Sequence, residues 1–120
     1  MISFKVENLN SMNASLRTFA EFLREREVAE EDIFASRLVS SELISNCIIH
    51  SGETAVFKGE ILDGKISITV LSSGAEKVNL HPVLPDVLSE SGRGMYIVKS
   101  VCLGEIERED GGLRVYIKLH

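Results

Sequence analysis

Two runs of β-branched and apolar residues, at 54–63 and 65–71, meet at the dipeptide Asp63-Gly64. Asp-Gly between two such runs is a strong signal for a tight β-hairpin, because the favoured turn needs a positive φ at both central residues. A second pair of runs, at 105–109 and 113–119, meets across Asp110-Gly111-Gly112 and predicts another hairpin. Since hairpins join antiparallel strands, these signals constrain the chain to a mostly antiparallel sheet.

The first half of the chain follows a helical period instead. After Asn10-Ser11, which offers N-cap chemistry, the apolar residues recur at helical spacing, and this amphipathic helix is expected to end near Glu27. A second helix is expected from the acidic residues 30–32 to about His50. Residues 3–7 predict a short first strand, and a third, short helix is expected between the loop 72–92 and Gly104. The expected order is β-α-α-β-β-loop-α-β-β.

This order predicts an α/β (α+β) two-layer sandwich, in which a mostly antiparallel mixed sheet carries three helices on one face. The 120 residues have the size of one domain, residues 1–120, and no repeat or linker divides them. The formal net charge of −5 argues against direct nucleic-acid binding, and no apolar run approaches the roughly 18 residues that span a membrane. The N-terminus lacks a signal-peptide layout, and the two cysteines show no pairing pattern, so we expect a cytoplasmic protein.

A carboxylate and an amide interrupt the apolar face of the second helix. At 100° per residue, Glu42 and Asn46 fall one turn apart in the middle of a stripe that we expect to face the sheet. An ionisable side chain rarely leaves water uncompensated, so a metal, a ligand or an opening to solvent should lie beside it. The two oxygens could orient Mg²⁺, or the carboxylate could activate a hydroxyl or water. A partly exposed Glu42 bonded to Asn46 or to the backbone explains the pair equally well.

Gly92-Arg93-Gly94 directly precedes the expected third helix. Glycines there let backbone N–H groups turn toward an anion at the helix N-terminus, and Arg93 could add positive charge. An ordinary loop-to-helix turn explains the same residues. The phosphate loop GxxxxGK[ST] and a strand-GxGxxG-helix unit do not occur in the sequence, so the commonest nucleotide-binding folds are unsupported.

Taken together, these segments resemble the histidine-kinase-like (GHKL) ATPases and, within them, the anti-sigma-factor serine kinases. Residues 42–50, ELISNCIIH, resemble the family's N-box helix, ELxxNxxxH. Residues 91–98, SGRGMYIV, resemble its second glycine box. The order of helix, hairpin, loop, glycine box, helix and final hairpin follows the family across nearly the whole chain. The resemblance implies a GHKL ATPase-like fold that binds ATP and Mg²⁺.

The resemblance also implies roles by position. Asn46 would coordinate the Mg²⁺ that bridges the ATP phosphates, and Glu42 would be the catalytic general base toward a substrate serine hydroxyl. Gly92 and Gly94, with Arg93 between them, would lie against the triphosphate. Residues 75–91 would form the lid over it. These roles fit phosphoryl transfer, in which positioning and charge neutralisation dominate.

The first glycine box departs from the family pattern DxGxG, whose Asp accepts a hydrogen bond from the adenine amino group. Residues 72–76 read Ser-Ser-Gly-Ala-Glu, so Gly74 is kept, Ser72 replaces the carboxylate and Glu76 replaces the second glycine. A neutral hydroxyl is a weaker acceptor than a charged oxygen, so adenine recognition should be weakened. The predicted nucleotide-binding residues are Asn46, Ser72, Gly74, Gly92, Arg93 and Gly94.

The function expected from the resemblance is that of an anti-sigma-factor-like regulator. It would bind a sigma factor or an anti-sigma antagonist and, if it is an active enzyme, phosphorylate a serine on the antagonist with ATP. Two alternatives stay open: a non-catalytic protein-binding module that has lost productive ATP binding, or the detached ATP-binding domain of a sensor histidine kinase. Ile33, Ile44 and Ile48 are expected to pack on the first helix; exposed, they would form a partner or homodimer surface.

Overall fold

The computed structural model describes residues 1–51, 54–73, 75, 98, 100–102, 106–109 and 111–120, with the backbone alone described at 49–51. Its helices and strands follow the predicted order, with each boundary within a few residues of the expected one. In chain order they are β1 (Ile2–Val6), α1 (Leu9–Glu25), α2 (Glu30–Ser51), β2 (Ala55–Leu62), β3 (Lys65–Leu71), β4 (Glu107–Glu109) and β5 (Gly112–Lys118).

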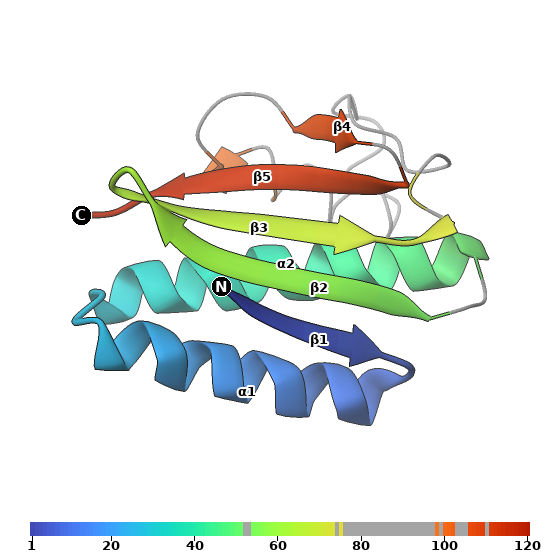
Figure 1. The fold of residues 1–120 in the computed structure, drawn as a ribbon, viewed down its shortest axis with the longest axis horizontal. Coiled ribbons are helices and arrows are strands. Elements are labelled where there is room, and N and C mark those ends of the chain that lie inside the picture. Colours follow the sequence, from blue (N-terminus) through green and yellow to red (C-terminus); the bar gives the residue numbers. More distant parts are fainter. Residues whose placement is uncertain (52–53, 74, 76–97, 99, 103–105, 110) are drawn as a thin grey trace.

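The five strands form one sheet in the order β1-β2-β3-β5-β4, and α1 and α2 run side by side along it (Figure 1). All four neighbouring pairs are antiparallel, so the described sheet contains no parallel pair. The predicted two-layer α+β fold is therefore confirmed, with an antiparallel sheet where a partly mixed one was expected. Of the predicted third helix, residues 98, 100 and 101 are helical, and the Cys102 N–H donates to the Val98 carbonyl at 3.0 Å.

The prediction that Asn10-Ser11 caps α1 is wrong, because the helix begins two residues earlier. Asn8 has extended backbone angles and is the N-cap. Its side-chain oxygen accepts from the Ser11 N–H at 2.9 Å, and the Asn8 N–H donates to Ser11 Oγ at 3.0 Å. This reciprocal capping box satisfies two N–H groups at the start of the helix.

The Asp63-Gly64 hairpin is confirmed. Asp63 and Gly64 have φ angles of +53° and +73°, as a turn of this kind requires, and Leu62 pairs with Lys65 across it. The second hairpin likewise turns through Gly111, whose φ is +76°. The first turn sets the register of β2 with β3, and the second sets that of β4 with β5.

The helices cover the apolar face of the sheet. Phe57, Val70 and Leu113 stand opposite one another on β2, β3 and β5, and each is completely buried. From α1, the ring of Phe19 packs on Phe57 with ring centroids 5.1 Å apart, in an edge-on arrangement. It also lies over Gly59, where an added Cβ would come within 2.5 Å of the ring. The sheet can accept α1 this closely only because residue 59 has no side chain.

The second helix lies against β2, β3 and β5 as well as against α1. Ile33 and Ile44 are buried in the core and Ile48 is partly buried against it, as expected for residues packed within the fold. These three residues therefore do not provide an exposed partner surface. Contacts with the sheet and with α1 bury a wide part of the circumference of α2. The burial of each polar residue of α2 therefore depends on both contacts.

Candidate functional site

Asn46 lies at the edge of the buried part of α2, and Glu42 lies just beyond that edge. Fully buried α2 residues centre on Ser36, Leu43 and Cys47, each with no exposed surface. Asn46 is 5% exposed, whereas Glu42 is half-buried. The prediction that both occupy the middle of a sheet-facing stripe is therefore wrong: packing on α1 turns the centre of the buried face away from them.

The Asn46 side chain carries an unsatisfied donor. Its amide nitrogen Nδ2 is inaccessible to solvent and has no hydrogen-bond partner within the part of the chain that the structure describes. A buried donor without an acceptor costs about 1–3 kcal/mol, so such groups are rare and call for an explanation. An oxygen-rich ligand beside Asn46 would satisfy Nδ2, while the amide oxygen of the same side chain suits a hard cation such as Mg²⁺. The residue therefore fits a nucleotide phosphate with its magnesium ion.

Glu42 precedes Asn46 by one helical turn, so both side chains leave the same side of α2. Glu42 is half-buried, so the residue keeps some exposure to solvent one turn from Asn46. A carboxylate in this position can accept a proton from a hydroxyl group bound beside it. The pair thus combines a proton acceptor with an amide that lacks a partner.

Ser72 follows β3 directly and begins a short 3₁₀ turn that reaches Ala75. Its backbone N–H donates to the Gly111 carbonyl at 2.8 Å, and its carbonyl accepts from the Ala75 N–H at 3.1 Å. The Ser72 residue is 8% exposed and Ala75 is 1% exposed. The guanidinium of Arg108 donates to the Ala75 carbonyl at 2.7 Å. The loop expected at 72–92 therefore starts as an ordered turn bound to the β4–β5 hairpin.

The remaining predicted site residues lie outside the described part of the chain. They are Gly74 of the first glycine box and Gly92, Arg93 and Gly94 of the second. Their assignment to the nucleotide thus stays a prediction, and Glu42, Asn46 and Ser72 are the predicted site residues that the structure describes.

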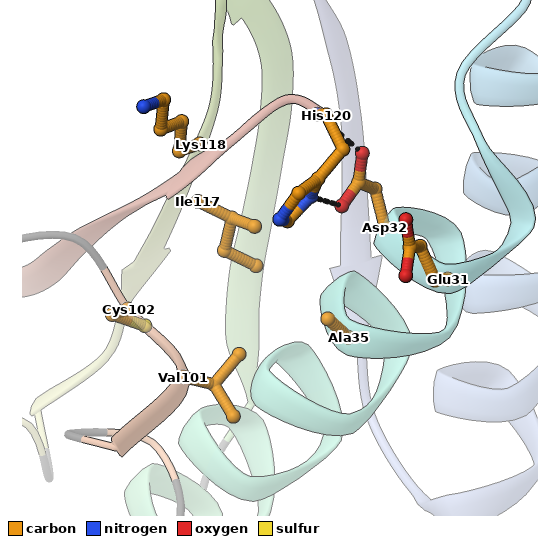
Figure 2. A pocket seen from close by; sticks show the side chains of 8 residues that line it. All are labelled: Glu31, Asp32, Ala35, Val101, Cys102, Ile117, Lys118 and His120. Atoms are coloured by element: carbon orange, nitrogen blue, oxygen red, sulfur yellow. Dashed lines mark hydrogen bonds and ion pairs between the residues drawn. The ribbon is translucent and has the colours of Figure 1, made fainter.

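A cavity of about 290 Å³ opens at the other end of α2 (Figure 2). The His120 backbone N–H donates to one carboxylate oxygen of Asp32 at 2.8 Å, and its ring nitrogen Nδ1 lies 2.5 Å from the other. Oxygens of Glu31 and Asp32 and a ring nitrogen of His120 lie within 4.8 Å of one another. Asp32 is 14 residues from Asn46, or about 21 Å along a helix, so this cluster is separate from the Glu42–Asn46 pair.

The Asp32–His120 contact was missed by sequence reasoning. The acidic residues 30–32 indicated a helix start, and no sequence pattern linked them to His120. The side chain of His120 is 66% exposed, whereas that of Asp32 is only 3% exposed. Hydrogen bonding to Asp32, followed by the charges of Asp32 and Glu31, raises the pKa of His120. The backbone N–H and the imidazole of His120 thus lie against the buried Asp32 carboxylate and tie residue 120 to α2.

The two cysteines are unpaired thiols. Cys47 is fully buried, and Cys102 is partly buried in the wall of the cavity beside Asp32. Burial raises the pKa of Cys47 to about 11 and that of Cys102 to about 12. Both therefore stay protonated near neutral pH and are poor nucleophiles and poor metal ligands.

A two-layer fold with a polar amide and a carboxylate on the central helix defines a candidate nucleotide-binding domain. The family model for the histidine kinase-like ATPase domain matches residues 6–119, nearly the whole chain. The chain belongs to the histidine kinase-like ATPase family, whose members in general bind a nucleotide with Mg²⁺. A search of curated proteins gives no match. Among the described helices, none combines the length and the apolar character that crossing a membrane requires.

Proposed function

We propose that the chain is an anti-sigma-factor-like regulator that binds Mg-ATP and phosphorylates a serine of an antagonist protein. The observation that carries nucleotide binding is the buried Asn46 amide, whose Nδ2 has no partner among the described residues. The regulatory and kinase roles rest on the resemblance of residues 42–50 and 91–98 to the anti-sigma-factor serine kinases. We place this activity in the cytoplasm, with a sigma factor or its antagonist as the partner.

In this proposal the binding residues divide between the two ends of the nucleotide. Asn46 would hold the magnesium ion and the phosphates, together with the backbone of Gly92 and Gly94 and the charge of Arg93. Ser72 and Gly74 would lie at the adenine end. Bound Mg-ATP would supply a transferable γ-phosphoryl group whose negative charge is partly neutralised by the metal.

Glu42 would act as the general base. As the serine oxygen of the antagonist protein forms its bond to the γ-phosphorus, the carboxylate of Glu42 accepts the hydroxyl proton. The bond between the γ-phosphorus and the oxygen that bridges to the β-phosphate breaks, and ADP leaves with that electron pair. General-base catalysis contributes about 10²- to 10⁴-fold, so Glu42→Gln should lose phosphoryl transfer by this factor while it keeps nucleotide affinity.

A second candidate is a protein-binding module that has lost productive ATP binding. The feature that favours it is Ser72, a nearly buried neutral hydroxyl at the position of the family's base-recognising Asp. A hydrogen bond to a charged acceptor is roughly twice as strong as one between neutral groups, so this replacement lowers the affinity for adenine. The partner-binding role is common to both candidates.

Titration of Mg-ATP and Mg-ADP onto the wild type, Asn46→Ala and Ser72→Asp separates the two candidates. By calorimetry, the proposal predicts wild-type binding that Asn46→Ala abolishes and Ser72→Asp strengthens. A wild type that binds no nucleotide at millimolar concentration, with binding gained in Ser72→Asp, would establish the binding module instead. Where the wild type binds, incubation with a candidate antagonist and detection of phosphoserine tests the transfer, with Glu42→Gln as the matched control.

A further inference from the structure

We infer that Arg108 is a positioning residue for the base of the bound nucleotide, because it fixes the turn that begins at Ser72. This inference rests on the proposed nucleotide-binding function. It concerns a residue of the β4–β5 hairpin that lies 36 positions from Ser72 in the sequence and outside every motif by which the site was predicted.

Arg108 lies on the helix-covered side of the sheet. In the register of β4 with β5 it stands opposite Leu113, a completely buried core residue. Its neighbours Glu107 and Glu109 point to the opposite side, where Glu109 pairs with Arg114 at 2.9 Å. The alternation of a strand thus directs one arginine of the hairpin toward the layer of the helices and the other away from it.

The guanidinium of Arg108 holds the far end of the turn. Its nitrogen Nη1 donates to the carbonyl of Ala75 at 2.7 Å, the short distance typical of a charge-assisted hydrogen bond. Ala75 is 1% exposed, whereas Arg108 is an exposed residue. Without Arg108, the carbonyl of Ala75 would lose its charged partner.

The near end of the turn is held by the same hairpin. The Ser72 N–H donates to the carbonyl of Gly111, in the turn between β4 and β5, at 2.8 Å. Within the turn, the Ala75 N–H donates to the Ser72 carbonyl at 3.1 Å. The hairpin therefore holds both Ser72 and Ala75, the first through the Gly111 carbonyl and the second through the Arg108 guanidinium.

A fixed turn matters here because Ser72 is a weak acceptor. A carboxylate tolerates imperfect geometry because its charge acts over distance, whereas a hydroxyl depends on correct placement. Ordering a loop when the ligand arrives also costs affinity, and a turn ordered beforehand avoids that cost. Loss of the Arg108 bond should therefore weaken the binding of every ligand that carries the base, whatever its number of phosphates.

The test compares Arg108→Ala and Arg108→Lys with Arg114→Ala. Arg114 is the matched control, because it belongs to the same hairpin and bonds Thr69 and Glu109 on the other side of the sheet. Dissociation constants are measured by calorimetry for Mg-ATP and Mg-ADP, and by displacement for adenosine. Arg108→Ala should weaken all three by a similar factor, roughly tenfold, Arg108→Lys should recover part of the loss, and Arg114→Ala should bind as the wild type does.

Three affinity results overturn the inference: unchanged affinities in Arg108→Ala, an equal loss in Arg114→Ala, or a loss much larger for Mg-ATP than for adenosine. The last result would identify Arg108 as a phosphate contact. Hydrogen exchange of the Ala75 N–H, measured without ligand, should accelerate in Arg108→Ala but not in Arg114→Ala, and equal rates in the two variants also overturn it. If the wild type binds no nucleotide, the proposed function is overturned. If the wild type binds nucleotide and Arg108→Ala binds it equally well, this inference alone is overturned.

Discussion

Replacement of Asn46 by alanine is expected to leave the ligand-free chain at least as stable as the wild type, while it abolishes stabilisation by Mg-ATP. Truncation of a buried side chain usually lowers the free energy of unfolding. Asn46 differs because its buried Nδ2 donates to no acceptor among the described residues. The substitution removes this uncompensated donor together with the packing of the side chain.

The expected size follows from three terms. Removal of a buried donor that lacks a partner recovers about 1–3 kcal/mol. Alanine in the interior of α2 adds about half a kcal/mol of helix propensity over asparagine. Against these gains, the packing of the lost side-chain atoms is worth about 1–2 kcal/mol. Together these terms change the free energy of unfolding by between about −0.5 and about +2.5 kcal/mol, so we expect little change or a gain.

Ser40→Ala provides the matched control on the same helix. Ser40 is completely buried, and its hydroxyl also lacks a partner among the described residues. Its removal should likewise leave the chain as stable as before or more stable. Because Ser40 has no proposed contact with the nucleotide, this variant should keep the full response to Mg-ATP.

The assay is urea unfolding followed by circular dichroism, with and without Mg-ATP at about one hundred times its dissociation constant. At that concentration the wild type and Ser40→Ala should gain about 2.7 kcal/mol, and Asn46→Ala should gain nothing. A ligand-free Asn46→Ala variant that is more than about 2 kcal/mol less stable than the wild type would refute the reasoning, since it would show that the amide is satisfied in the fold. An undiminished gain with Mg-ATP would refute the nucleotide role.

Three further variants test the fold around the site by chemical denaturation. Gly59→Ala should cost about 1–3 kcal/mol, because its Cβ would lie 2.5 Å from the Phe19 ring, and Phe19→Leu in the same chain should reduce that cost. Gly64→Ala should cost only about 1 kcal/mol, since its φ of +73° is strained for alanine although the space around it is open. Asp32 raises the pKa of His120 above its ordinary value of 6.5. The contribution of this pair to the free energy of unfolding should therefore be complete below pH 6.5 and should fall as the pH rises through the raised pKa. Asp32→Asn should flatten this pH dependence of stability.

Local signals account for the parts of the fold that the sequence predicts correctly. Asp63-Gly64 specifies its hairpin because the two residues tolerate the positive φ that they adopt. The start of α1 was harder, since Asn8 and Asn10 both offer a capping side chain. The structure selects Asn8 because β1 ends at Val6, so the chain is still extended at residue 8.

Contacts between distant segments account for what the sequence does not predict. Asp32 meets His120 across 88 positions, and Arg108 meets Ala75 across 33. No periodicity marks either pair, because each depends on where the β4–β5 hairpin lies in the sheet relative to a distant segment. Sequence motifs therefore predicted the candidate ligands on α2 but not the residues that hold the neighbouring segments in place.

The rotation of α2 links the fold to the proposed chemistry. Had α2 packed on the sheet alone, Glu42 and Asn46 would face the strands, and a ligand could reach them only by opening the core. Packing on α1 as well brings Asn46 to the border of the interior and leaves Glu42 half-buried. A phosphate that supplies the missing partner of Nδ2 would therefore approach at the border of the interior, on the side of Glu42. The amide N–H groups of Leu43 and Cys47 should accordingly exchange more slowly with bound nucleotide only to the extent that the free energy of global unfolding rises.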